Sequence, residues 1–187
     1  MANRNTQGFG LVPAGTLGQT PSTSGTGKYK IDAGYATTIF QGGAVASNAG
    51  YIIDGQTTDA PILGVLNGIF FKAATTLKPT FANFYKQPIT PANSEDIDAF
   101  VFDNPQQQYV VATDAAVAQS GFLETYDMNA SAGSTTTGRS SSTLDIGDTS
   151  ADAAAFRLLR SAEDPENDEN AAFRSVVVVP NLIELQS

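Results

Sequence analysis

The sequence predicts an all-β fold, a compact antiparallel β-barrel or β-sandwich with an extended N-terminal arm. Short runs rich in β-branched and aromatic residues recur along the chain, separated by Gly and Asn. The 187 residues include 17 Gly, and only one stretch carries a helical signal. A parallel α/β sheet would need repeated amphipathic helices, so we expect antiparallel strands instead.

Residues 1–27 are expected to form the arm, and residues 28–187 the β-domain, which should fold without it. The arm is rich in Gly, Ser, Thr and Pro and has no helical or strand periodicity, so it buries too little apolar surface to order by itself. An extended segment with a few apolar anchors is the pattern of one that becomes ordered on a partner, and the alternative is a flexible terminus that happens to contain Phe and Leu. The expected partner contacts are the four large apolar residues of the arm, Phe9, Leu11, Val12 and Leu17.

The domain begins with short strands, expected at 37–47, 50–55 and, more weakly, 81–86. Residues 62–71 predict a longer strand, in which Gly64 and Gly68 indicate a bulge or a sharp bend. The clearest hairpin spans 99–114, because two β-rich runs flank Asp103-Asn104-Pro105, a sequence that favours a turn.

Two later segments are harder to assign. Residues 129–143 are polar and low in complexity, which predicts a long loop that is mobile or held by a neighbour. Residues 150–162 carry a helical signal that starts at Ser150, but strands surround them, so we expect a strand after a helical turn. Residues 175–185 form the closing strand, and Pro180 predicts an edge position or a bulge there.

Charge divides the chain into two unequal parts. Through Ser94 there are three acidic and six basic residues, whereas from Glu95 onward there are sixteen acidic residues and four Arg, giving a net charge of −9. This division favours head-to-tail or side-by-side packing with an oppositely charged neighbour, a homo-oligomer among the candidates. The alternative is that the acidic residues only keep the protein soluble.

The composition excludes several function classes. The chain has no His, Cys or Trp, so a Ser-His-Asp or Cys-His apparatus, imidazole or thiolate metal sites and disulfides cannot form. An acidic protein is a poor ligand for nucleic acid. No apolar run has the length of a membrane helix, and the first ten residues lack the apolar region of a secretory signal. We therefore expect no enzyme, cofactor, nucleic acid or membrane.

The remaining motifs favour structural interpretations. The acidic residues 163–169 lack the Gly that an EF-hand loop requires, which favours a solvated turn over a calcium site. Glu95, Asp96 and Asp98 favour crowded surface acids over a glycosidase pair. An aromatic-rich middle is interpreted as core, with a ligand-binding lining as the alternative. Its members are Phe71, Phe81, Phe84, Tyr85, Phe100, Phe102 and Tyr109.

Over residues 36–185 the chain resembles small head proteins of tailed bacteriophages, especially marine ones. The order of its segments carries the resemblance: a strand ending in GAV, a G-V-x-x-G strand, a KPTF-x-N-x-Y segment, a D-x-P-x-Q-x-Y hairpin, and closing strands with FR-x-L and V-x-V-x-x-N. The residues at these positions are Gly64, Val65, Gly68, Lys78, Pro79, Thr80, Asn83, Tyr85, Asp103, Pro105, Gln107 and Tyr109.

The resemblance implies a capsid decoration (cement) protein without enzymatic activity. Such a protein is made in the host cytoplasm, binds the major capsid protein on the outer surface of the virion and stabilises the shell by bridging capsomers, often as a dimer or trimer. Besides the arm, the loop 129–143 is a candidate clamp, with Arg139 as its contact residue. The alternative is a carbohydrate- or ligand-binding β-module, such as a head-fibre or host-surface adhesion component.

Overall fold

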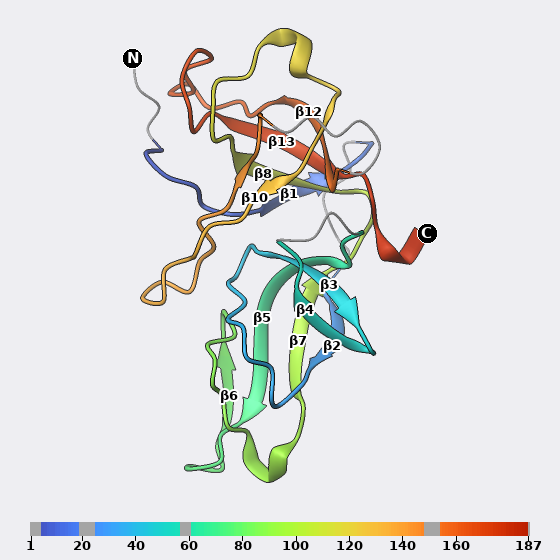
Figure 1. Ribbon diagram of the computed structural model, residues 1–187, viewed down its shortest axis with the longest axis vertical. Helices are drawn as coiled ribbons and strands as arrows, with labels where there is room; N and C mark the ends of the chain where they lie inside the picture. Colours follow the sequence, from blue (N-terminus) through green and yellow to red (C-terminus); the bar gives the residue numbers. More distant parts are fainter. Residues whose placement is uncertain (1–4, 19–24, 57–60, 148–153, 187) are drawn as a thin grey trace.

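The computed structural model, which describes residues 5–18, 25–56, 61–147 and 154–186, shows an elongated all-β molecule with two lobes (Figure 1). All paired strands are antiparallel, so the predicted fold class is confirmed. The helices of the described part are single 3₁₀ turns, η1 (Ala92–Ser94), η2 (Gln119–Gly121) and η3 (Glu184–Gln186). None of the described helices has the length and apolarity needed to cross a membrane.

The lower lobe is one curled sheet with the strand order β2-β7-β5-β3-β4, to which β6 adds by pairing with β5. Curling brings the edge strands β2 and β4 near each other, but no backbone ladder joins their described residues, so the sheet is not a closed barrel. Its strands are β2 (Gly27–Ile31), β3 (Ala44–Asn48), β4 (Tyr51–Asp54), β5 (Gly64–Lys72), β6 (Pro79–Ala82) and β7 (Ile97–Phe102).

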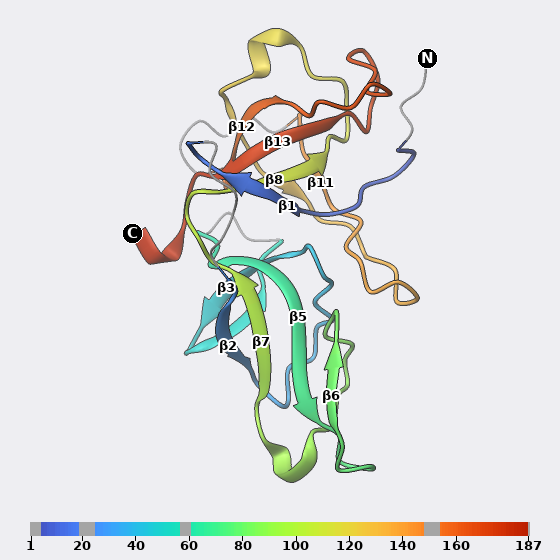
Figure 2. The ribbon, with the colours of Figure 1, turned by 180° about the vertical axis from the view of Figure 1, so that it is seen from behind.

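The upper lobe contains a sheet with the order β1-β8-β13-β12-β9 and the small pair β10-β11 (Figure 2). The described sheets pack together and none closes into a barrel, which is consistent with the β-sandwich alternative. The strands are β1 (Val12–Thr16), β8 (Gln107–Ala112), β9 (Thr125–Tyr126), β10 (Met128–Asn129), β11 (Thr143–Leu144), β12 (Phe156–Ser161) and β13 (Ser175–Pro180).

Each lobe has its own apolar core. In the upper core, Tyr109 and Phe156 meet edge to face, with ring centroids 6.4 Å apart, among valines of β13. In the lower core, the inward positions of β7 are buried and alternate with half-buried ones, the pattern of a strand with one face against a core. Val65 of β5 belongs to the upper core, so the longest strand of the lower lobe contributes to both.

The predicted hairpin at 99–114 is wrong, although its turn is present. The N–H of Gln107 donates to the carbonyl of Asn104 across the turn, at 3.0 Å. However, β7 pairs with β2 and β5 in the lower lobe, and β8 pairs with β1 and β13 in the upper lobe. Both strands are central and use both backbone edges, so neither has an edge free for the other. The turn is therefore the passage between the lobes.

Two other predictions are confirmed, and one is wrong. β5 has a register shift between Leu66 and Gly68, where a bulge or bend was expected. Residues 156–161 form a strand, while Ser150 lies outside the described residues. β13 is central and not an edge strand. It tolerates Pro180 because this residue ends the strand, beyond the last pair with β8 at Val178.

Candidate functional site

A groove of about 210 Å³ lies where the two lobes meet, and it collects four of the five residues expected to contact a partner. The N-terminal segment contributes Phe9, Leu11, Val12 and Pro13, and the loop contributes Arg139. The lower lobe supplies the remaining lining. These residues are Gln41, Gly42, Leu66, Asn67 and Phe102.

The N-terminal segment reaches the groove as part of the upper lobe. β1 pairs with β8, and Leu11, only 2% exposed, is a member of the upper core. The N–H of Gly10 donates to the carbonyl of Ser142 at 3.1 Å, and the N–H of Leu11 donates to that of Gly42 at 2.8 Å. The described part of the arm is thus built into the fold, and it does not behave as the separable arm that the composition predicted.

Glycines make this close packing feasible. Gly10 and Gly42 have φ angles of 72° and 79°, the left-handed region that residues with a Cβ rarely adopt. A Cβ on Gly10 would lie 2.8 Å from the carbonyl oxygen of Gly42. Gly10 and Gly42 therefore allow the N-terminal segment to pack closely between the two lobes.

The loop 129–143 is held by its own chain. Gln41 and Arg139 form a parallel bridge, in which the N–H of Gln41 donates to the carbonyl of Gly138 and the N–H of Ser140 donates to that of Gln41, both at 2.9 Å. The side-chain amide of Asn83 donates to the carbonyl of Thr137 at 2.8 Å. The neighbour that holds the loop is therefore the lower lobe of the same molecule.

A buried polar network anchors the base of the loop. Ser140 and Ser142 donate their hydroxyls to Oε1 of Gln56, and the Nε2 of Gln56 donates to Asp54 at 3.1 Å. Gln56, Ser140 and Ser142 are all buried. Buried polar groups are costly unless they are paired, so this network favours one position of the loop.

The groove combines an apolar floor with polar groups at its rim. Leu11 and Leu66 are buried, whereas Val12 is 40% exposed and Arg139 is exposed. The bulge in β5 points Asn67 into the groove, where its backbone carbonyl accepts a hydrogen bond from the Gln41 side chain at 3.0 Å. Arg139 forms no ion pair with another described residue. The groove is therefore suited to an apolar side chain accompanied by an anionic or carbonyl oxygen.

The fifth predicted contact residue lies apart from the groove. Leu17 follows β1, is 41% exposed, and donates its N–H to the carbonyl of Gln106 at 3.0 Å. Leu11 was expected to contact a partner, but its side chain is committed to the upper core. Val12 and Arg139 are thus the exposed predicted residues in the groove. Sequence reasoning missed Gln41 and Asn67, although the predicted bulge beside Gly68 was a signal for Asn67, and it named Phe102 only among the aromatic residues of the middle.

The aromatic-rich middle is not entirely core, contrary to the sequence interpretation. Tyr85 and Tyr109 are fully buried, but Phe81 is 63% exposed, and Phe100 is partly exposed on the same face of the lower sheet. Their ring centroids are 6.1 Å apart. The sequence interpretation failed because it did not tell which face of each strand turns outward.

The acidic segment 163–169 is a turn held by neutral side chains and one buried arginine. The amide of Asn167 donates to the carbonyl of Ser175 at 2.8 Å, and its carbonyl accepts the N–H of Ser175 at 2.9 Å. The guanidinium of Arg174 pairs with Glu169 at 3.2 Å and lies 5.2 Å from the centre of the Phe122 ring. Among the described residues, no group of three carboxylate, His or Cys side chains could hold a metal ion.

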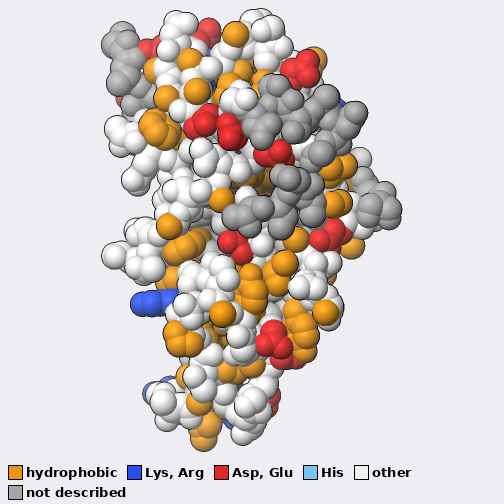
Figure 3. All heavy atoms as spheres, viewed as in Figure 1, with side chains coloured by type: hydrophobic (Ala, Val, Ile, Leu, Met, Phe, Trp, Pro, Cys, Tyr) orange, Lys and Arg blue, Asp and Glu red, His pale blue; other side chains and the backbone are white. Residues whose placement is uncertain are grey.

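Acidic side chains concentrate over the upper lobe, as the face in Figure 3 illustrates. Residues 25–102 contain five Lys and six acidic residues, so this segment is nearly neutral, whereas residues 103–187 contain thirteen acidic residues and four Arg. The mildly basic part of the sequence, which ends at Ser94, therefore does not correspond to one lobe. The lower lobe also contains Glu95, Asp96 and Asp98, which come after Ser94.

Comparison with protein-family models, with curated proteins and with solved structures finds no match to this chain. The resemblance to bacteriophage head proteins therefore stays a prediction from the sequence motifs.

Proposed function

We propose that this chain is a non-enzymatic virion structural protein, a decoration protein that binds the outside of the major capsid protein shell and bridges neighbouring capsomers. The observation that carries this proposal is the groove between the lobes, which unites the N-terminal segment and the polar loop. The sequence had suggested both as clamps for a neighbour.

The chemistry of the groove supports attachment to another protein. Val12 presents apolar surface, and Arg139, which forms no ion pair with another described residue, presents its guanidinium beside the apolar floor formed by Leu66. Arg is enriched in interface cores because its planar group binds carboxylates and carbonyls in two places. A loop or strand end of a capsid protein with one apolar and one acidic side chain could pack against Val12 and form an ion pair with Arg139.

The free edge of β1 is poorly suited to pairing with a strand of the partner, so we expect side chains to make the attachment. Its pairing with β8 shifts register between Pro13 and Gly15, and Pro13 has no N–H to donate. Both features discourage pairing with a foreign strand. Attachment should therefore depend on Val12 and Arg139.

The test is binding to shells assembled from the major capsid protein of the same virus, measured by co-sedimentation. Val12→Asp and Arg139→Glu should each weaken binding about tenfold or more. Leu77→Asp and Lys86→Glu repeat the same kinds of change at exposed positions outside the groove and should bind like the wild type. Wild-type binding by both groove variants, or no binding by the wild-type protein, would overturn the proposal.

A further inference from the structure

The outer face of the lower sheet carries a row of side chains that are exposed except for the half-buried Asp98. Backbone register places Phe81 of β6 opposite Phe70 of β5, Phe70 opposite Asp98 of β7, and Asp98 opposite Lys30 of β2. The face thus changes from aromatic to basic across four strands. We call Phe70, Phe81, Phe100, Lys28 and Lys30 the aromatic–lysine face.

Gly68 shapes this face. It lies opposite Phe100 in the register, and a Cβ there would be 2.8 Å from the ring of Phe81. The ring of Phe81 therefore occupies the space above Gly68 and comes within 6.1 Å of Phe100, centroid to centroid. Phe81 remains 63% exposed and Phe70 38% exposed. Clustered exposed aromatic rings beside charged groups are typical of interaction surfaces.

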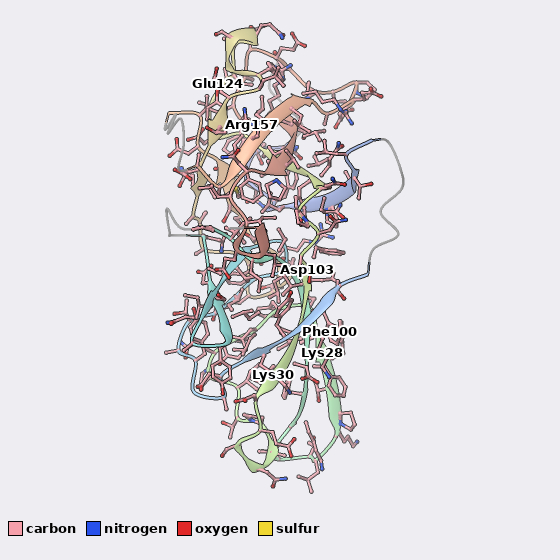
Figure 4. All side chains as sticks on the ribbon, turned by 90° about the vertical axis from the view of Figure 1, so that its right-hand side faces the viewer. Lys28, Lys30, Phe100, Asp103, Glu124 and Arg157 are labelled. Carbon is pink, nitrogen blue, oxygen red and sulfur yellow. The ribbon has the colours of Figure 1, made fainter. Side chains whose placement is uncertain are left out.

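The lysines are held in place on the face. Lys28 and Lys30 both pair with the carboxylate of Asp98, at 2.8 and 2.6 Å, while about half or more of each lysine side chain stays exposed. Two ammonium groups share the Asp98 carboxylate, and Asp96 and Glu95 also lie near enough to act on Lys30. Figure 4 places Lys28, Lys30 and Phe100 together on the lower lobe.

The complementary feature lies on the upper lobe of the same chain. Leu123 is 63% exposed and has a φ of 69°, a conformation that is strained for leucine. Its N–H donates to the carbonyl of Leu158 at 2.8 Å, and its carbonyl accepts a hydrogen bond from the guanidinium of Arg157 at 2.7 Å. An apolar side chain is thus fixed in an outward position, next to the exposed Glu124.

We propose that the Leu123–Glu124 corner of one copy docks on the aromatic–lysine face of a second copy. Leu123 would pack against Phe70 and Phe81, and Glu124 would pair with Lys28 or Lys30. The two features cannot meet within one molecule, because Figure 4 shows Glu124 and Arg157 in the upper lobe, far from Phe100. The contact is therefore heterologous and forms a ring or an open chain of copies.

Charge disfavours a symmetric contact between two upper lobes. The segment that forms most of the upper lobe has thirteen acidic residues against four Arg, so contact between two upper lobes would bring like charges together. Contact between an upper lobe and the aromatic–lysine face avoids that repulsion. Added salt should weaken the association, because it screens the exposed Glu124–lysine attraction.

Sedimentation velocity of the isolated chain from micromolar to millimolar concentration tests the proposal. The wild type should associate reversibly, and Phe81→Asp and Leu123→Asp should each raise the dissociation constant about tenfold or more. The matched control is Leu185→Asp, which changes an exposed leucine outside both surfaces and should associate like the wild type. Circular dichroism of each variant confirms that it is folded.

Mixing the two variants identifies the geometry. Phe81→Asp keeps an intact corner and Leu123→Asp keeps an intact face, so an equimolar mixture should form a complex of two copies and no larger species. A wild type that stays monomeric, variants that associate like it, or a mixture that stays monomeric would overturn the proposal. The sedimentation experiments use the isolated chain without capsid shells. Their failure would therefore not contradict the proposed attachment to a shell, which the co-sedimentation experiment tests separately.

Discussion

The backbones of Gln41 and Arg139 pair in parallel across the boundary between the two lobes. Two hydrogen bonds of 2.9 Å join the segment around Gln41 to the polar loop, and Leu11 of the N-terminal segment bonds to the adjacent Gly42. Three segments that are distant in the sequence therefore meet at one point. The position of the groove depends on this junction.

Gly138 should be essential for the junction. Its φ is 73°, and a Cβ there would lie 2.5 Å from the ring of Phe84, which stacks on Phe40 with ring centroids 5.6 Å apart. Gly138→Ala should lower the free energy of unfolding by about 1–3 kcal/mol, because it adds both backbone strain and a clash. Urea denaturation provides the measurement.

The matched control for this substitution is Gly25→Ala, at an exposed glycine whose Cβ would meet nothing within 4 Å. It should change the free energy of unfolding by no more than about 0.5 kcal/mol. Equal stability of the Gly138 and Gly25 variants would contradict the role given to the loop.

The Gln56 network should contribute to stability through its acceptor oxygen. Gln56→Leu leaves the buried hydroxyls of Ser140 and Ser142 without that acceptor, so the free energy of unfolding should fall by about 1–3 kcal/mol. Gln119→Leu, at an exposed position in η2, is the control and should have little effect. If urea denaturation finds both variants as stable as the wild type, the network does not stabilise the loop.

Asp98 should make the free energy of unfolding depend on pH in the acidic range. Burial acts to raise the pKa of Asp98, but hydrogen bonds from Lys28 and Lys30 outweigh it and hold the pKa below its ordinary value. A carboxyl whose pKa is lowered by folding stabilises the protein above its unfolded pKa, about 3.9, and this contribution disappears as the pH falls through the folded pKa.

Wild type should therefore lose more stability than Asp98→Asn when the pH falls from 6 to below about 3. The measurement is the urea midpoint of both proteins across this range. Parallel pH profiles would show that the ion pairs do not stabilise the fold.

Deleting residues 2–18 should destabilise the upper lobe, contrary to the sequence expectation of a separable arm. The deletion removes β1 from the edge of β8 and the buried Leu11 from the core. Loss of the leucine side chain alone costs about 2–5 kcal/mol in typical cores. Hydrogen exchange should show faster exchange in β8, and unchanged protection of β8 would contradict this prediction.

The strands were largely predictable because they carry local signals. The alternation in residues 97–102 and the run of valines at 176–179 reflect burial that each residue experiences within its own strand. Strand partners were not predictable in the same way. The same turn sequence at Asn104 can connect two strands of one hairpin or two strands of different sheets. Which of the two forms depends on the other strands that pair with β7 and β8, namely β2 and β5 for β7 and β1 and β13 for β8.

The candidate site was partly predictable for a related reason. Val12 and Arg139 stood out as apolar or charged residues in polar surroundings, and both line the groove. Leu11 looked identical in sequence but is buried, because its side chain enters the upper core as the chain reaches β1. The exposure of Phe81 followed from the space above Gly68, a contact between strands that no local pattern reports.

A reconstruction of the assembled capsid by electron cryo-microscopy tests the central claim most directly. Decoration of the shell predicts two-lobed density on its outer surface, with the groove around Val12 and Arg139 against a capsid subunit. Capsids that contain the chain inside the shell or in the tail, or shells whose outer surface lacks this density although the protein is present in excess, would contradict it.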